Sequence, residues 1–174
     1  MNDADLFAHY EKVYYHELNR KEQIFSRLNV PLAVMVAVAG FYAVLIGGDY
    51  KELEFGVRIW FWVTFALSLL ALAGGAVFFV DALLGRIDSA LADPNTLETW
   101  RQSLRVYYSD QENCDAVVAD EVRRALYADF MNCSSVMTMN NDRKASSLYF
   151  CNVLLIIAVF FAVVSYAIEK IPSL

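Results

Sequence analysis

IWFWVTFALSLLALAGGAVFFV, residues 59–80, carries no charged side chain over about 22 residues. As a helix this stretch would be roughly 33 Å long, which matches the hydrocarbon core of a bilayer. A buried helix of a water-soluble protein is usually shorter and keeps one polar face, whereas this stretch is apolar on every side. It therefore predicts a membrane-spanning helix.

Two further uncharged runs, residues 30–46 and 148–168, flank this stretch along the chain. The first is at the lower limit of spanning length; Pro31 fits its first helical turn, and Gly47 and Gly48 are expected to end it. Because a short polar connector joins it to residues 59–80, the two runs predict a helical hairpin. The composition agrees, with 58% hydrophobic residues and a mean hydropathy of +0.38.

The rest of the chain also predicts helices, so the expected fold class is an all-α integral membrane protein with three transmembrane helices. Residues 5–28 have apolar positions three and four apart, which indicates an amphipathic helix. Neither Gly nor Pro occurs between Pro94 and Pro172, which favours helix throughout. We expect the second span to continue to residue 92, a helix capped by Asn95 or Thr96, and another from Asp115. The predicted domains are an N-terminal helix (1–29), the hairpin (30–80), a helical insert (81–147), the third span (148–168) and a tail (169–174).

The distribution of Lys and Arg predicts the orientation in the membrane. Four lie in the N-terminal segment and seven in residues 81–147, against two in the hairpin loop and one in the tail. The positive-inside rule then places the N-terminus and the insert in the cytoplasm and the C-terminus outside. For a bacterial protein this means the inner membrane.

No catalytic, metal or cofactor pattern is present in the sequence. Cys114, Cys133 and Cys151 have neither metal-ligand spacing nor an even count, and His9 and His16 lie two helical turns apart without a third ligand. No activated nucleophile or phosphate-binding glycine loop occurs. We therefore expect no enzyme and no cofactor, and the chain lacks the further spans and repeats of a secondary transporter.

Several basic residues could form a collar that binds phosphate in an oligomer. The net charge of −6 argues against general coating of nucleic acid, and residues 81–147 hold eleven acidic and seven basic residues, a net charge of −4. Any phosphate would need converging arginines, whose planar fork suits phosphate oxygens. The alternative is surface ion pairs, because Glu98 precedes Arg101 by three residues and Asp120 precedes Arg124 by four. The candidates are Arg101, Arg105, Arg123, Arg124, Arg143 and Lys144.

Polar side chains within the spans are candidates for lining a pore or for contact with another helix, namely Asn152, Ser165, Thr64 and Ser68. Small residues recur at intervals of four on these runs, which suits close helix packing in an oligomer. Because three uncharged spans cannot enclose a water-filled path alone, a pore would need a symmetric homo-oligomer.

Two segments carry a resemblance to a known class of proteins: YYHELNRKEQIFSRLNVPL (residues 14–32) and NNDRK (residues 140–144) just before the last span. They resemble small membrane effectors of bacterial anti-phage defence operons, and the channel subunit of Hailong-type systems is the nearest likeness. The order of N-terminal helix, hairpin, helical insert and last span extends the resemblance over most of the chain.

The resemblance implies a homo-oligomeric channel, as a tetramer, which is gated by an oligonucleotide from a partner nucleotidyltransferase-like protein and depolarises the membrane of the infected cell. One alternative is the class of two-transmembrane effectors opened by cyclic nucleotides, from which the third span departs. A membrane scaffold without a pore is another. An adjacent nucleotidyltransferase gene would favour the gated effector, and collapse of the membrane potential on unregulated expression would exclude the scaffold.

Overall fold

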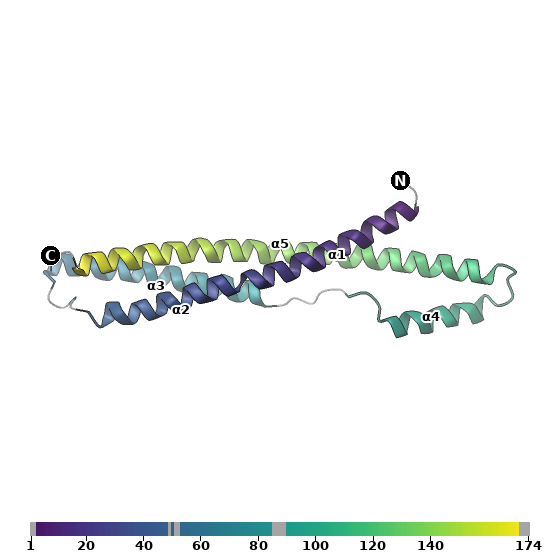
Figure 1. The fold of residues 1–174 in the computed structure, drawn as a ribbon, viewed down its shortest axis with the longest axis horizontal. Coiled ribbons are helices and arrows are strands. Elements are labelled where there is room, and N and C mark those ends of the chain that lie inside the picture. Colours follow the sequence, from purple (N-terminus) through teal and green to yellow (C-terminus); the bar gives the residue numbers. More distant parts are fainter. Residues whose placement is uncertain (1–2, 49, 51–52, 85–89, 171–174) are drawn as a thin grey trace. The chain divides into compact units, whose positions relative to one another are not determined.

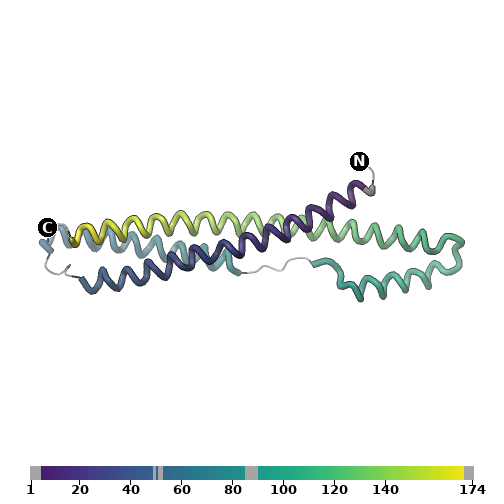
Figure 2. Tube along the Cα trace, viewed as in Figure 1, coloured from purple at the N-terminus to yellow at the C-terminus, as the bar shows by residue number. Residues whose placement is uncertain are grey.

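The computed structural model describes residues 3–48, 50, 53–84 and 90–170, and these are helical with no strand among them, at 90% helix. Figure 1 shows the ribbon and Figure 2 the course of the chain. Three segments are long and apolar enough to span a membrane, Asp5–Ile46, Phe55–Leu83 and Cys114–Lys170. The predicted all-α fold with three candidate spans is confirmed at this level. The helices are α1 (Asp3–Arg27), α2 (Asn29–Ile46), α3 (Phe55–Leu83), α4 (Pro94–Tyr107) and α5 (Cys114–Lys170).

The ends of the first two helices follow the expected residues. A single residue, Leu28, separates α1 from α2, and Pro31 lies in the first turn of α2, where its missing N–H leaves the Arg27 carbonyl without its helical partner. At the other end the Gly47 N–H donates to the Ala43 carbonyl at 3.1 Å, and α2 ends at Ile46. The amphipathic helix and the first span therefore follow each other almost directly.

Two expected boundaries are wrong. The helix of the second span ends at Leu83 rather than at residue 92, because Leu84 is extended and residues 90–93 are not helical; residues 85–89 lie outside the described part. The cap of α4 is Asp93, whose carboxylate accepts from the Asn95 N–H at 3.1 Å, with Pro94 in the first helical position. The capping residue therefore lies two positions before Asn95.

The chain divides into two compact units, which are described separately. The span unit comprises Gln23–Leu84 and Arg143–Leu174, and the insert unit comprises Met1–Glu22 and Gly85–Asp142. The insert unit thus contains most of the N-terminal helix and residues 85–142 of the predicted insert. The predicted C-terminal tail lies largely outside the described residues, which end at Lys170.

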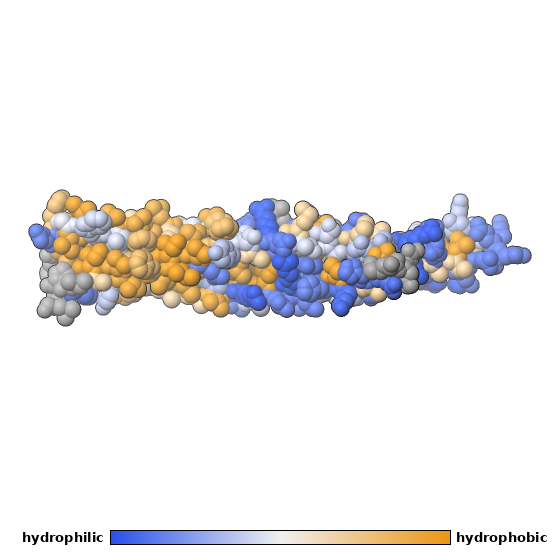
Figure 3. Space-filling view, turned by 90° about the horizontal axis from the view of Figure 1, so that it is seen from above, coloured by the Kyte–Doolittle hydropathy of each residue, from blue (hydrophilic) through white to orange (hydrophobic). Residues whose placement is uncertain are grey.

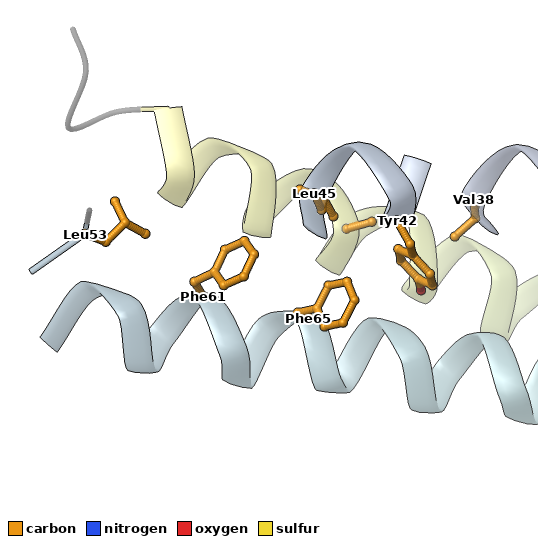
Figure 4. Packing of buried hydrophobic residues seen from close by; sticks show 7 residues of the cluster. Val38, Tyr42, Leu45, Leu53, Phe61 and Phe65 are labelled. Carbon is orange, nitrogen blue, oxygen red and sulfur yellow. The ribbon is translucent and has the colours of Figure 1, made fainter. Parts of the chain in front are cut away.

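In the span unit, α2, α3 and the C-terminal part of α5 pack around aromatic and aliphatic side chains (Figure 4). Phe61 is 1% exposed, and its ring stacks on Tyr50 with centroids 5.4 Å apart and on Phe65 at 6.1 Å. A Cβ on Gly75 would lie 3.5 Å from a methyl of Leu155, an ordinary van der Waals contact, so α3 and α5 touch at this position. On the face seen in Figure 3, hydrophobic side chains cover most of the surface of these helices. The buried cluster is Val38, Tyr42, Leu45, Leu53, Phe61, Phe65 and Ala162.

In the insert unit, α1 lies against α5 through a series of aromatic rings. Phe7 and Tyr14 each meet the edge of Phe130 with centroids 5.6 Å apart, and Tyr10 meets Tyr127 at 5.3 Å. These α1 residues are three and four apart, so they form one face of the helix. Residues 109–113 lie between α4 and α5, and α4 lies beside the start of α5 (Figure 1).

The contact between α1 and α5 also includes one buried polar cluster. Asn141 on α5 is 2% exposed, and its Nδ2 donates to both the carboxylate and the backbone carbonyl of Glu17 at 2.9 Å. Beside it the Arg20 guanidinium donates to Asp142 at 2.6 Å, and this bond raises the pKa of Arg20. The cluster satisfies a carboxylate that is 94% buried.

Candidate functional site

Three of the six predicted phosphate-binding residues line one pocket of about 340 Å³ in the insert unit. Arg101 and Arg105 come from one face of α4, and Arg123 comes from α5. We call this the arginine pocket. Its other lining residues are Phe7, Asp115, Val118, Ala119, Val122 and Leu126.

Two of these guanidinium groups are held by carboxylates. Arg101 donates two hydrogen bonds to the Glu98 carboxylate, at 2.7 and 2.6 Å. This bidentate pair lowers the pKa of Glu98 to about 2. Arg105 donates twice to the same oxygen of Asp115, at 3.0 and 2.6 Å. The second pair joins the end of α4 to the start of α5. These two helix ends form one side of the pocket.

Arg123 differs from the other two because it has no carboxylate partner among the described residues. Its guanidinium lies over the Phe7 ring at 6.0 Å from the centroid, and the residue is exposed. A guanidinium on an aromatic face keeps its hydrogen-bond donors for another acceptor. With three guanidinium groups and two paired carboxylates, Glu98 and Asp115, the site keeps one positive charge.

Arg123 and Arg124 line a second pocket of about 300 Å³ in the same unit. Here Arg124 is paired with Asp120 at 2.8 Å and lies 3.8 Å from Glu121. Glu98 therefore pairs with Arg101, and Asp120 pairs with Arg124. Both are the surface ion pairs that the sequence offered as the alternative to phosphate binding. The remaining lining residues are Leu6, Phe7, Asp120 and Tyr127.

The last two basic candidates belong to the span unit. Arg143 contacts the Asp81 carboxylate at 3.0 and 3.4 Å, and the Ser147 hydroxyl donates to the same carboxylate at 2.6 Å. These hydrogen bonds join the end of α3 to α5. Lys144, next to it, is half-buried. Their phosphate-binding role stays a prediction.

The aromatic residues of α4 do not form a core of the insert. No residue of α4 is buried; Tyr107 is 78% exposed and Trp100 37%. Both side chains are therefore exposed rather than packed between helices of this unit. The aromatic residue that does line the arginine pocket is Phe7, which comes from α1 and lies 116 positions before Arg123.

The polar residues predicted to line a pore have different surroundings. Ser68 and Ser165 are fully buried and Thr64 is 8% exposed, all within one chain. The Ser68 hydroxyl donates to the Ala158 carbonyl at 2.6 Å and meets the Tyr42 hydroxyl at 2.7 Å. The Thr64 and Ser165 hydroxyls meet at 2.8 Å. These groups hold α2, α3 and α5 together, whereas Asn152 is exposed; pore lining stays a prediction.

Within the described residues no group of three or more His, Cys, Asp or Glu side chains is placed to hold a metal ion. His9 packs against the ring of Tyr10. All three cysteines are free thiols.

Comparison with known proteins adds no relative. No family model matches the chain, and no curated protein and no solved structure is significantly similar to it.

Proposed function

We propose that this chain is the subunit of a ligand-gated channel of the bacterial inner membrane, and that a phosphate-bearing oligonucleotide opens or closes it by binding at the arginine pocket. The channel is a homo-oligomer, with a tetramer favoured. It acts as an anti-phage effector that depolarises the cell, and it performs no chemistry. Its ligand comes from a partner nucleotidyltransferase-like protein.

The observation that carries this proposal is the convergence of Arg101, Arg105 and Arg123 on one pocket. A volume of about 340 Å³ lies at the lower end of the range for small-ligand sites, so one pocket suits about one nucleotide. Repetition around a symmetry axis would give several pockets for successive phosphates of a short oligonucleotide. Arg123 is the residue that we expect to contact a phosphate first, since no carboxylate competes for it.

The span unit supports the requirement for several copies. Thr64, Ser68 and Ser165 use their hydroxyls within one chain, so these three groups are not available to line a path through a single subunit. Large hydrophobic side chains remain exposed on all three, among them Leu70, Val36 and Ile156. Such surfaces face lipid or another copy of the chain.

Binding is tested by titrating labelled short single-stranded DNA onto the purified protein. The variant Arg123→Glu removes the unpaired guanidinium without breaking an ion pair and should weaken binding at least about tenfold. The matched control Arg58→Glu reverses one charge at the start of α3, in the span unit, and should bind normally. Wild-type affinity should fall as salt rises.

Equal affinity of Arg123→Glu and wild type would reject the arginine pocket. A cyclic dinucleotide that binds where linear DNA does not would favour the class opened by cyclic nucleotides. If wild-type protein binds neither, the trigger is a different molecule.

The channel itself is tested separately. Protein reconstituted in a planar bilayer should conduct, and mass measurement in mild detergent and in lipid should give an oligomer. A monomer in both would reject the channel and favour the scaffold. Reporter fusions at the C-terminus should indicate the periplasm and fusions near Asn95 the cytoplasm, since the orientation depends on the positive-inside rule alone.

A further inference from the structure

A third pocket, of about 390 Å³, lies in the span unit where α1 passes into α2 beside α5. Arg27, the last residue of α1, and Asn152 and Tyr149 of α5 provide its polar groups. We call it the junction pocket. Its other lining residues are apolar: Ile24, Val30, Pro31, Ala145 and Leu148.

The polar groups of this pocket are not used within the chain. Among the described residues, neither the Arg27 guanidinium nor the Asn152 amide has a hydrogen-bond or ion-pair partner, and both residues are exposed. This contrasts with Thr64, Ser68 and Ser165, whose hydroxyls all have partners. The Asn152 amide is therefore available to an acceptor or donor from outside the chain.

The sequence places this pocket at a membrane surface. Arg27 comes just before the uncharged residues 30–46, and Arg143 and Lys144 come just before the uncharged residues 148–168. Both helices that form the pocket therefore enter their apolar runs at this level. Tyr149 is 65% exposed, and tyrosine is enriched at the level of lipid headgroups.

We infer that the junction pocket binds the phosphodiester headgroup of an anionic phospholipid, from the leaflet on the side of the N-terminus. The Arg27 guanidinium pairs with the phosphate, and the Asn152 amide donates to a phosphate or glycerol oxygen. The acyl chains lie on Val30, which is 67% exposed. Basic pockets between transmembrane helices bind anionic lipid headgroups in this way, and the inference requires membrane insertion only, not the oligonucleotide.

The test is native mass spectrometry of the full chain in mild detergent, titrated with phosphatidylglycerol, phosphatidylcholine or glycerol 3-phosphate. Phosphatidylglycerol should bind more tightly than phosphatidylcholine, and glycerol 3-phosphate should bind weakly because it lacks acyl chains. Arg27→Gln and Asn152→Leu should each weaken phosphatidylglycerol binding about tenfold. The control Arg58→Gln removes a charge outside the pocket and should leave binding unchanged.

Equal binding of both lipids, or equal binding by Arg27→Gln and Arg58→Gln, would reject the site. Glycerol 3-phosphate that binds as well as phosphatidylglycerol would show that the ligand is a free phosphate compound and would overturn the lipid assignment. Both substituted side chains are exposed, so the variants should keep the wild-type helical circular dichroism. A helical signal lost in Arg27→Gln would leave Asn152→Leu to decide the outcome.

Discussion

The insert unit and the span unit hold their helices together with different polar chemistry. In the insert unit several polar contacts are charged and exposed, such as Arg105 with Asp115, whose side chains are 49% and 79% exposed. The contacts between span helices include neutral hydroxyls that are fully buried, such as Ser68 and Ser165. A charge next to water costs little and contributes little, whereas in hydrocarbon only neutral groups with satisfied hydrogen bonds are inexpensive.

Both units contain polar groups of two kinds, those that fix helix packing and those that stay available to a ligand. Glu17 with Asn141, and Ser68 with Ala158, are buried pairs that fix helix packing. Arg123, Arg27 and Asn152 are exposed and have no hydrogen-bond or ion-pair partner among the described residues. Polar groups that the fold does not use are the ones that we assign to ligands.

The largest loss of stability is expected from Phe61→Ala in the span unit. Its ring is 1% exposed between Tyr50 and Phe65, so truncation leaves a cavity and should cost about 3 kcal/mol. Phe160→Ala is the matched control, because that ring is 61% exposed and should cost less than about 1 kcal/mol. Unfolding by SDS in mixed micelles measures both. Equal losses would show that the cluster around Phe61 does not hold the span helices together.

The next effect is expected in the insert unit. Asn141→Leu leaves the Glu17 carboxylate buried without its amide donor and should cost about 2 to 3 kcal/mol. The double variant Glu17→Leu with Asn141→Leu should lose less than the sum of the two single variants, since no buried charge then remains. Denaturant unfolding followed by circular dichroism gives the coupling. Strict additivity would contradict the buried pair.

A smaller effect tests the hydroxyl contacts in the spans. Ser68→Ala removes the bonds to Ala158 and Tyr42 and should cost about 1 kcal/mol, as is usual for hydrogen bonds between membrane helices. Arg101→Gln, which breaks the exposed pair with Glu98, should leave the unfolding midpoint unchanged. A larger loss from Arg101→Gln than from Ser68→Ala would reverse the contrast between the units.

The smallest effect concerns the thiols of the insert unit and leaves stability unchanged. Burial and the nearby Asp129 raise the pKa of Cys133, so at pH 8 a smaller fraction of this thiol is thiolate than of an unperturbed cysteine. Cys114 is partly exposed. Iodoacetamide should therefore modify Cys114 faster than Cys133, by at least about tenfold, and the rate at Cys133 should keep rising at higher pH. Mass spectrometry of timed samples gives the two rates, and similar rates would contradict the burial of Cys133.

Residue order and composition were sufficient for the spans and for most helix ends. Residues 59–80 predict a span from length and lack of charge, and Pro31 and Gly47 predict where α2 begins and ends. The expected end of α3 at residue 92 was wrong although the sequence carries a stop signal. Gly85 directly follows the capping residue Leu84, a position at which glycine commonly ends helices.

The candidate site was predictable only where its contacts are local. Glu98 and Arg101 are one helical turn apart, so their pairing follows from spacing. The contact of Arg123 with Phe7 joins residues far apart in the chain, as does the bond of Asn141 to Glu17 across 124 positions. Neither contact leaves a periodic signal in the sequence.

The physical reason lies in the range of each interaction. Transfer into hydrocarbon depends on the summed polarity of about 20 consecutive residues, and helix ends depend on a few neighbouring backbone groups, so both can be deduced from the chain in order. Helical periodicity then shows which residues share a face, but the partner of that face depends on how whole helices pack. The packing of α1 and α4 against α5 brings Phe7, Arg101, Arg105 and Arg123 to one pocket, and the packing of α2, α3 and α5 turns the span hydroxyls toward one another.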